Sequence, residues 1–196
     1  MTEEEKGLIE SAQNGDSASF GKLYDRYAER IYRFIFLKTG HKSDTEDLLH
    51  EVFLSSWRTI DSYQLRGGIP FTSWLYRIAG NRVIDWYRTR KGNSSLDEMM
   101  ETGALPIELA STSHTALLEA LDRGFEMDIV MKALRGLKEV EQTILLMRYV
   151  EDLSPEEIAH ATEKTGSAVR LIQHRALAKL KKILEISHER TATRTS

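Results

Sequence analysis

Apolar residues recur at intervals of three and four through most of this chain, and this spacing constrains its fold more than any other feature. The first long stretch runs from Ser17 to Lys38 and carries Phe20, Leu23, Tyr24, Tyr27, Ile31, Phe34 and Ile35. Residues spaced in this way line one face of an α-helix. Only three prolines occur in 196 residues, and no stretch alternates as a strand does. The sequence therefore predicts an all-α fold.

Helix breakers divide the pattern into segments. Gly40 should end the first helix, and Ser43 with Glu46 has the form of a capping box for the next, which reaches Ile60. Gly67 to Pro70 precedes a third helix from Phe71 to about Arg90. Later helices are expected over 129–137, 139–150, 154–162 and 167–186. We expect two small helical domains, 1–91 and 116–186, joined by a flexible acidic linker over 92–115 and followed by a frayed tail over 187–196.

Composition excludes several classes of protein. The chain has no cysteine, so it has no disulfide and no thiolate metal site. No apolar run approaches the roughly 18 to 20 residues that a membrane span needs. The acidic start, Met1 to Glu5, lacks the pattern of a signal peptide. We therefore expect a cytoplasmic protein without membrane insertion.

The net charge of −3 hides an uneven distribution. Residues 74–91 and 164–182 are basic, whereas the stretch between them is acidic from Asp97 to Glu126. Attraction to phosphate acts over about 8 to 10 Å at physiological salt, so local charge matters more than the total. Two basic lobes with an acidic connector indicate a nucleic-acid partner.

The C-terminal part predicts a helix-turn-helix. Ser154 is a suitable N-cap with Pro155 at the first helical position, and a short turn through Glu163 to Gly166 leads into a longer helix. The second helix of such a motif can lie in the DNA major groove. Its predicted interior arc contains Val169, Ile172, Gln173, Ala176, Leu177, Leu180, Ile183 and Leu184. The opposite arc contains Arg170, Leu171, His174, Arg175, Ala178, Lys181 and Lys182.

This outer arc fits DNA recognition. Arginine pairs with guanine, and an apolar side chain such as Leu171 meets a thymine methyl group. Arg175 and Lys179, with Lys181 and Lys182, are better placed to hold phosphates. The alternative is a solvated lysine-rich face on an ordinary helix. Gln173 could read adenine, but its position in the apolar arc favours a structural role.

Several motifs of this chain resemble those of one protein family. Residues 141–150 (EQTILLMRYV), 153–159 (LSPEEIA) and 168–170 with 173–177 resemble region four of extracytoplasmic-function (ECF, group 4) sigma factors, in the sigma-70 family of RNA polymerase. Residues 44–53 (DTEDLLHEVF) with Trp57 and Arg58 resemble the core-binding helix of the family. Residues 71–81 (FTSWLYRIAGN) and 84–88 resemble its promoter-melting helix. The resemblance covers nearly the whole chain outside the linker and the two ends.

The resemblance implies a division of labour. The N-terminal domain would bind the clamp helices of the largest subunit of core RNA polymerase and open the minus-ten element of promoter DNA. The C-terminal domain would read the minus-thirty-five element and contact the polymerase flap. The acidic linker would imitate nucleic acid in the polymerase channels, although acidic linkers also occur simply because they stay solvated. The resemblance implies no enzymatic activity and no cofactor, an anti-sigma factor as a further partner, and association with the nucleoid when bound to polymerase.

The residue pattern and the family resemblance together indicate three sets of site residues. For core polymerase we expect Asp44, Asp47, Leu48, Glu51 and Trp57, with Leu48 and Trp57 as exposed apolar anchors. The acidic residues there also have a simpler explanation, because they stabilise a helix N-terminus. For minus-ten DNA we expect a row of Arg77, Asn81, Ile84 and Arg88, with Tyr76 and Tyr87 beside it and Arg90 and Lys91 beyond it. For minus-thirty-five DNA we expect Ser167, Arg170, Leu171, His174, Arg175 and Lys179.

Two further expectations concern the third helix. Trp74 falls on its apolar arc and is expected in the protein interior. By resemblance alone, the loop over 62–70 captures a flipped base.

Some features leave alternatives open. Glu163, Lys164 and Ile172 depart from the family pattern and leave the recognition-helix register and the promoter sequence undetermined. A stand-alone helix-turn-helix regulator that binds duplex DNA is the main alternative. The six histidines form no His-x-x-x-His motif, which argues against a helical metal hydrolase. A purely structural helical adaptor is the last alternative.

Overall fold

The computed structural model describes residues 1–64, 68–93 and 127–192, and the side chains at the helix ends 91–93, 127–129 and 186–192 are not described. Throughout these ranges the chain is helical or in short connections, without a strand, which confirms the predicted all-α fold. The chain forms two compact units. Helices α1 to α4 belong to the first, and α6, α7, α9 and most of α8 to the second. Most of the predicted linker and the acidic residues Asp97 to Glu126 lie outside the described residues.

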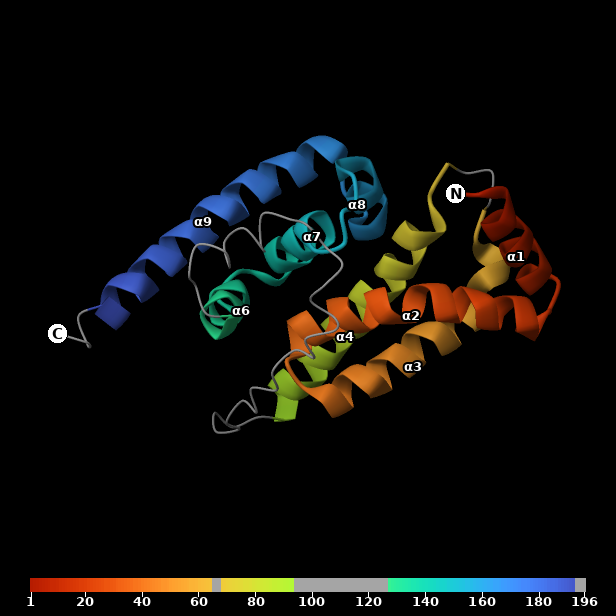
Figure 1. Cartoon of the computed structure of the whole chain (residues 1–196), viewed down its shortest axis with the longest axis horizontal. Helices are drawn as coiled ribbons and strands as arrows, with labels where there is room; N and C mark the ends of the chain where they lie inside the picture. The colour runs from red at the N-terminus through yellow and green to blue at the C-terminus, as the bar shows by residue number, and fades with distance from the viewer. Residues whose placement is uncertain (65–67, 94–126, 193–196) are drawn as a thin grey trace. The chain divides into compact units, whose positions relative to one another are not determined.

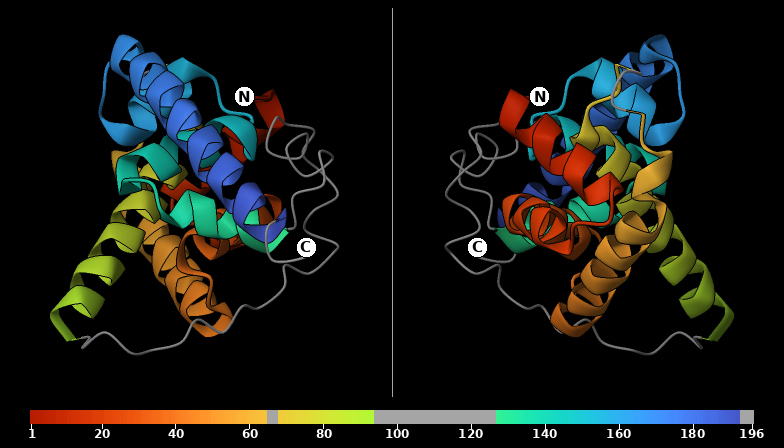
Figure 2. Two further views of the ribbon diagram at one scale, coloured as in Figure 1. Left: turned by 90° about the vertical axis from the view of Figure 1, so that its left-hand side faces the viewer. Right: turned by 90° about the vertical axis from the view of Figure 1, so that its right-hand side faces the viewer.

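The first unit is arranged around α2 (Ser17–Thr39). This helix contacts α1 (Glu3–Gln13), α3 (Lys42–Thr59) and α4 (Phe71–Asn93), and a short 3-10 helix, η1 (Ile60–Ser62), follows α3 (Figures 1 and 2). Helix α1 was not predicted. Thr2 caps it, three glutamates occupy its first turn, and Ile9 and Ala12 are buried.

The turn between α2 and α3 differs in part from the prediction. Gly40 ends α2 in a left-handed conformation (φ 74°), as expected. The predicted capping box of Ser43 and Glu46 is wrong, because α3 already begins at Lys42 with His41 as its N-cap. A single extended residue, His41 (φ −122°, ψ 123°), separates Gly40 from the start of α3. The Thr45 hydroxyl then donates to the His41 carbonyl (2.6 Å), inside the first turn.

Aromatic rings join α2, η1 and the start of α4. Phe71 contacts Tyr27, Tyr63 and Trp74, with ring centroids 5.6, 5.2 and 5.3 Å away. Offset and edge-on aromatic contacts of this kind add to the stabilisation from burial. All four side chains are buried, so Trp74 lies in the interior as predicted. This cluster fixes the N-terminal end of α4.

The second unit contains the predicted helix-turn-helix. It comprises α6 (Met127–Arg135), α7 (Glu139–Tyr149), α8 (Pro155–Thr162) and α9 (Gly166–Ala192), with α9 packed on α6 and α7. Ser154 caps α8 as predicted, since its hydroxyl accepts from the Glu157 amide and its own amide donates to the Glu157 carboxylate. Helix α9 continues to Ala192, six residues past the predicted end.

Glu163 forms the turn between α8 and α9 in a left-handed conformation (φ 54°). The Lys164 amide donates to the Ala159 carbonyl (2.9 Å), which completes the helix end. Glycine adopts this backbone region without strain, whereas a residue with a Cβ does so at a cost.

We expect Gly40→Ala to lower the free energy of unfolding by about 1 kcal/mol or more, because a Cβ is disfavoured at positive φ. Gly21→Ala is the matched control in the same helix. No neighbouring atom lies within 4 Å of a Cβ added at Gly21, so alanine should stabilise α2 there by about 0.5–1 kcal/mol. Urea denaturation measures both, and equal effects of the two changes would contradict the role given to Gly40.

Candidate polymerase and nucleic-acid interfaces

Helix α3 presents one continuous exposed face, which we call the α3 stripe. Its members lie at helical spacing and are all exposed: Asp47, His50, Glu51, Leu54 and Arg58. Leu54 stands out because half of its surface is exposed (50%) in the middle of a charged face. An exposed large apolar residue framed by charges is a feature of protein interfaces. The sequence predicted Asp47 and Glu51 at this site but not His50 and Leu54. The two missed residues lie three and seven positions after Asp47, a spacing that places them on the same helix face.

The predicted apolar anchors on α3 need correction. Leu48 is 5% exposed, so the expectation that it is an exposed anchor is wrong. It lies on the side of α3 that also buries Thr45, Leu49 and Val52. Trp57 is half-buried, and its ring packs against Phe20 of α2 with centroids 4.9 Å apart. Leu54 therefore takes the position on the outer face that had been assigned to Leu48.

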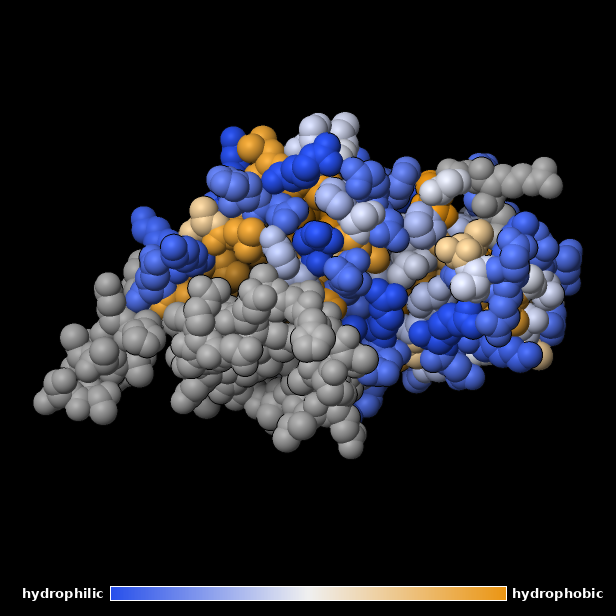
Figure 3. All heavy atoms as spheres, turned by 45° about the horizontal axis from the view of Figure 1, so that its top comes forward, coloured by the Kyte–Doolittle hydropathy of each residue, from blue (hydrophilic) through white to orange (hydrophobic). Residues whose placement is uncertain are grey.

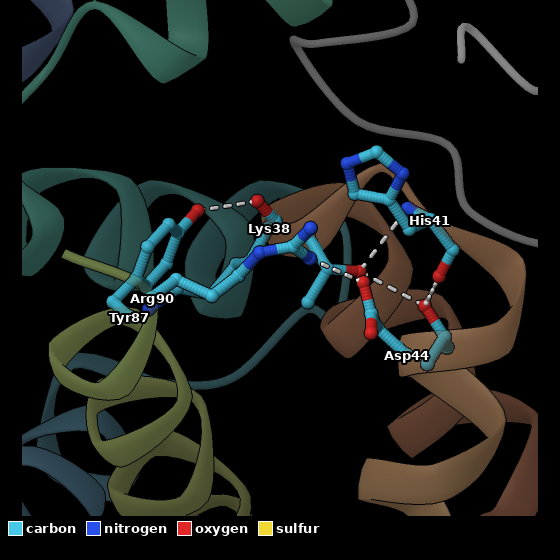
Figure 4. A network of polar contacts seen from close by, with 7 residues as sticks. Lys38, His41, Asp44, Tyr87 and Arg90 are labelled. Atoms are coloured by element: carbon cyan, nitrogen blue, oxygen red, sulfur yellow. Dashed lines mark hydrogen bonds and ion pairs between the residues drawn. The ribbon is translucent and has the colours of Figure 1, made fainter. Parts of the chain in front are cut away.

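Asp44 and Arg90 were predicted to bind different partners, but they bind each other. The Arg90 guanidinium donates to the Asp44 carboxylate (2.6 Å) and lies 4.9 Å from the ring centroid of Trp86. Close by, the Tyr87 hydroxyl donates to the Lys38 carbonyl at the end of α2 (2.5 Å). Figure 4 shows Tyr87 and Arg90 reaching from α4 toward the junction of α2 and α3. These contacts attach the last turns of α4 to the rest of the unit.

The predicted row on α4 is on the surface. Asn81 and Arg88 are exposed, and Arg77 and Ile84 are half-exposed, whereas Leu75, Ala79 and Val83 of the same helix are buried. Arg88 has Asp85 as a nearby partner (3.5 Å), but most of its side chain remains accessible (77%). Surface pairs of this kind are weak and exchange readily for another anion. We call Arg77, Asn81, Ile84 and Arg88 the α4 row.

Two residues predicted beside this row face inward. Tyr76 is completely buried, and its ring meets Phe34 edge-on at 5.3 Å, so its expected place on the DNA surface is wrong. Tyr87 is half-buried with its hydroxyl engaged at Lys38. Lys91 belongs to α4, but its side chain is not described. Tyr76 directly precedes Arg77 in the sequence, and successive residues of a helix point about 100° apart. Tyr76 is therefore turned away from the surface row and faces α2.

Helix α9 divides as its sequence predicts. Val169, Ala176, Leu180 and Leu184 are buried. Ser167, Arg170, Leu171, His174, Arg175, Ala178, Lys181 and Lys182 are exposed, and we call this set the α9 face. Leu171 is 50% exposed among basic neighbours. In Figure 3, apolar and hydrophilic residues are interleaved on the visible surface of this unit. The Gln173 amide donates to the Tyr149 hydroxyl (2.8 Å), which confirms its structural role.

The start of α9 is held by local hydrogen bonds. Thr165 accepts from the Ala168 amide (3.2 Å) as the N-cap, and its hydroxyl lies 3.1 Å from that of Ser167. Arg170 donates to Glu156 of α8 (3.1 Å), with both side chains largely exposed. Glu156 thus orients the guanidinium at the outer surface, where DNA phosphate or a base edge can replace the carboxylate.

Lys179 joins two helices of the second unit. Its ammonium pairs with the Glu141 carboxylate, whose other oxygen accepts from the Lys138 amide (3.1 Å). Burial acts to raise the pKa of Glu141, but the hydrogen bonds from Lys179 and Lys138 outweigh it, so the pKa lies below its usual 4.5. Lys179 thus links α9 to the start of α7, and this contact competes with its predicted use as a phosphate ligand.

Two features of the described residues bear on other functions. No group of three or more His, Cys, Asp or Glu side chains there is arranged to hold a metal ion. Within the same residues, every helix is too short or too polar to cross a membrane.

Two sigma-factor family models match the two units. The model described as Sigma-70 region 2 matches residues 23–92, which include α3 and α4. The model described as Sigma-70, region 4 matches residues 133–182, which include the helix-turn-helix. The α3 stripe and the α4 row therefore lie within region 2, and the α9 face lies within region 4.

Relatives support the same family. The chain is 30% identical over 181 residues to the ECF RNA polymerase sigma factor SigX of Bacillus subtilis, covering 87% of this chain and 86% of SigX. It is 31% identical over 179 residues to the ECF RNA polymerase sigma factor BldN of Streptomyces coelicolor, covering 90% of this chain but 64% of BldN. The solved structure of the sigma factor RpoE from Bartonella quintana has the same fold, with a TM-score of 0.67 and 17% identity over 85% of this chain and 97% of RpoE.

The chain belongs to the ECF family of RNA polymerase sigma factors. Proteins of this family bind core RNA polymerase and direct it to promoter DNA, and they are initiation factors rather than enzymes. This membership favours a sigma factor over the stand-alone regulator that the helix-turn-helix alone would allow.

We expect Glu141→Gln to lower the free energy of unfolding by about 1–2 kcal/mol at pH 7, because it weakens a charge-assisted pair with Lys179. A carboxylate with a lowered folded-state pKa stabilises the fold above the unfolded-state value, and this contribution is lost as the pH falls below it. The difference between variant and wild type should therefore shrink below about pH 4.5. Denaturation at pH 7 and pH 3 measures it.

Glu185→Gln is the control, since Glu185 is exposed and its nearest cation, Lys181, lies 3.8 Å away. This change should have almost no effect at either pH. A pH-independent loss in Glu141→Gln would show that the carboxylate charge does not matter.

Proposed function

We propose that the α3 stripe binds core RNA polymerase and that the α4 row and the α9 face bind the minus-ten and minus-thirty-five elements of the promoter. The observation that carries this proposal is the exposure pattern of α3 and α4. The two neighbouring helices expose different kinds of side chain: α3 exposes acidic and apolar side chains, whereas α4 exposes basic side chains and an amide. Each kind of surface suits a different partner.

The α3 stripe fits a protein partner. Asp47 and Glu51 precede Leu54 on the stripe and Arg58 follows it, an arrangement in which an apolar anchor is buried on binding while charges at the rim set orientation. A basic, partly apolar surface on the polymerase clamp would complement it. Asp44, already paired with Arg90, would contribute mainly by holding α4 in place.

The α4 row fits a single DNA strand. Arg77 and Arg88 supply phosphate contacts at both ends of the row, and Asn81 supplies a donor and an acceptor between them. Ile84 provides an apolar surface against which an unstacked base can lie. Arg90 is engaged with Asp44, so DNA contact at this end of α4 would depend on Arg88 first.

The α9 face fits duplex DNA. Arg170 and Leu171 lie in the first turns of the second helix of a helix-turn-helix, where base edges are read in the major groove. Arg175, Lys181 and Lys182 continue the same face and suit phosphates. Ser167 and His174 complete this surface, and Lys179 serves chiefly to attach α9 to α7.

A protein inhibitor would act on the same surfaces. The Bartonella quintana sigma factor RpoE is solved in complex with the anti-sigma factor NepR. An anti-sigma factor that covers Leu54 on the α3 stripe would prevent this chain from binding core polymerase. In this scheme the chain acts in the cytoplasm and joins the nucleoid when it is bound to polymerase.

The function is tested by adding the purified chain to core polymerase without a sigma factor and mapping new RNA start sites on genomic DNA of the source organism. Discrete start sites are expected. Arg77→Ala/Arg88→Ala should reduce initiation by about tenfold or more, since each lost charged contact is worth about 1.5 kcal/mol. Lys22→Ala/Arg26→Ala removes the same charge from exposed positions on α2 and should retain initiation.

Well-folded protein that neither binds core polymerase nor produces new start sites would contradict the proposal and favour a regulator that binds DNA alone.

Leu54→Asp should weaken binding to core polymerase by about tenfold or more, because a buried apolar anchor at an interface is worth about 2 kcal/mol. Lys22→Asp, which introduces the same residue at an exposed position of α2, is the control. Fluorescence anisotropy with labelled chain and core polymerase measures both affinities. Equal affinities for Leu54→Asp and wild type would exclude the α3 stripe as the binding surface.

A further inference from the structure

Gln13, the last residue of α1, attaches this helix to the segment that follows α3. Its side-chain amide donates to the carbonyl oxygens of Ile60 (2.9 Å) and Tyr63 (2.7 Å). The Ile60 carbonyl also accepts from the Tyr63 amide at the end of η1 (3.0 Å), so Gln13 adds a second hydrogen bond to it and supplies one to the Tyr63 carbonyl. Through these two bonds α1 fixes the exit of the chain from η1.

Tyr63 fixes the other end of the same segment. Its hydroxyl donates to the Ile69 carbonyl (2.6 Å), two residues before α4 begins. Its ring is 4% exposed and packs edge-on against Phe71, with centroids 5.2 Å apart. Burial and the nearby Glu5 carboxylate raise the pKa of Tyr63 to about 12, so the hydroxyl stays protonated and remains a donor. One residue thus connects the contact made by Gln13 to the start of α4.

The described ends of this segment are exposed beside these contacts. Gln64 and Gly68 are both on the surface, and Gly68 has a left-handed conformation (φ 71°). The segment leads directly into the helix that carries the α4 row. Groups held in place before binding lose less conformational entropy when they bind, so they discriminate better between ligands. A contact between a DNA base and Gln64, Gly68 or α4 therefore depends on the hydrogen bonds that hold the ends of this segment in place.

We propose that Gln13 and Tyr63 are positioning residues for minus-ten recognition. They hold the chain at Tyr63 and at Ile69, and with it the first turn of α4, in the geometry that promoter bases require, and neither residue contacts DNA itself. This inference rests on the proposed role of α4 and extends it to α1, which carries no residue of the α3 stripe, the α4 row or the α9 face.

The test uses holoenzyme assembled from the full chain and core polymerase. Its template is a promoter identified by start-site mapping, compared with copies in which single minus-ten bases are replaced. The measured quantity is the ratio of RNA from the native promoter to RNA from the replaced ones. Gln13→Glu keeps the size of the side chain but has no donor, and Tyr63→Phe removes only the hydroxyl.

Each variant should lower this ratio by about fivefold or more, as expected for one or two hydrogen bonds lost from a positioned segment. Affinity for core polymerase should remain at the wild-type value. Gln13→Lys, which can donate to both carbonyl groups, should restore the ratio. Asn14→Asp is the matched control, because it makes the same amide-to-carboxylate change at the next residue, whose side chain donates only to the Glu10 carbonyl at an exposed site.

A merely structural role would reduce RNA from all promoters equally and leave the ratio unchanged, and that result would overturn the inference. An unchanged ratio in Tyr63→Phe, which keeps the ring packing, would overturn it as well. If wild-type holoenzyme produced no discrete start sites, the proposed function itself would fail, and this inference with it.

Discussion

The burial of one face of α4 determines what the first unit can bind. Phe71 and Trp74 at its start pack into rings from α2 and η1, and Tyr76 and Val83 continue this face toward the interior. The opposite side of α4 faces solvent, and it carries Arg77, Asn81, Ile84 and Arg88. The aromatic cluster therefore contributes to stability and also sets the rotation of α4, on which the proposed DNA surface depends.

Charged residues that bind within a unit restrict the remaining surface further. Asp44 and Arg90 hold α3 and α4 together, and Glu141 and Lys179 hold α7 and α9 together. Each pair uses a residue that was expected to contact polymerase or DNA. The charges left outside these pairs are fewer and more sharply localised, with acids before Leu54 on α3 and bases along α9. This separation lets a chain with a net charge of −3 present a basic surface.

Helical periodicity was sufficient to predict the helices after α1 and most of their faces. The two arcs of α9, the interior position of Trp74 and the structural role of Gln173 all follow from a spacing of 3.6 residues. The errors concern contacts between helices. Leu48 and Tyr76 lie near the edge of an arc, and only the position of the neighbouring helix decides whether they are buried. The Asp44–Arg90 pair joins residues 46 positions apart in the sequence, a separation that helical spacing does not address. Helix α1 has too few apolar residues for their spacing to predict a helix.

Crosslinking can show whether α3 and α4 present separate surfaces to polymerase and to DNA. A photoreactive amino acid would be placed at Leu54 or at Asn81, and holoenzyme bound to a mapped promoter would be irradiated. We expect position 54 to crosslink to the largest polymerase subunit and position 81 to DNA at the minus-ten element. Crosslinks from position 54 to DNA, or from position 81 to polymerase alone, would show that the two surfaces are not separate in this way.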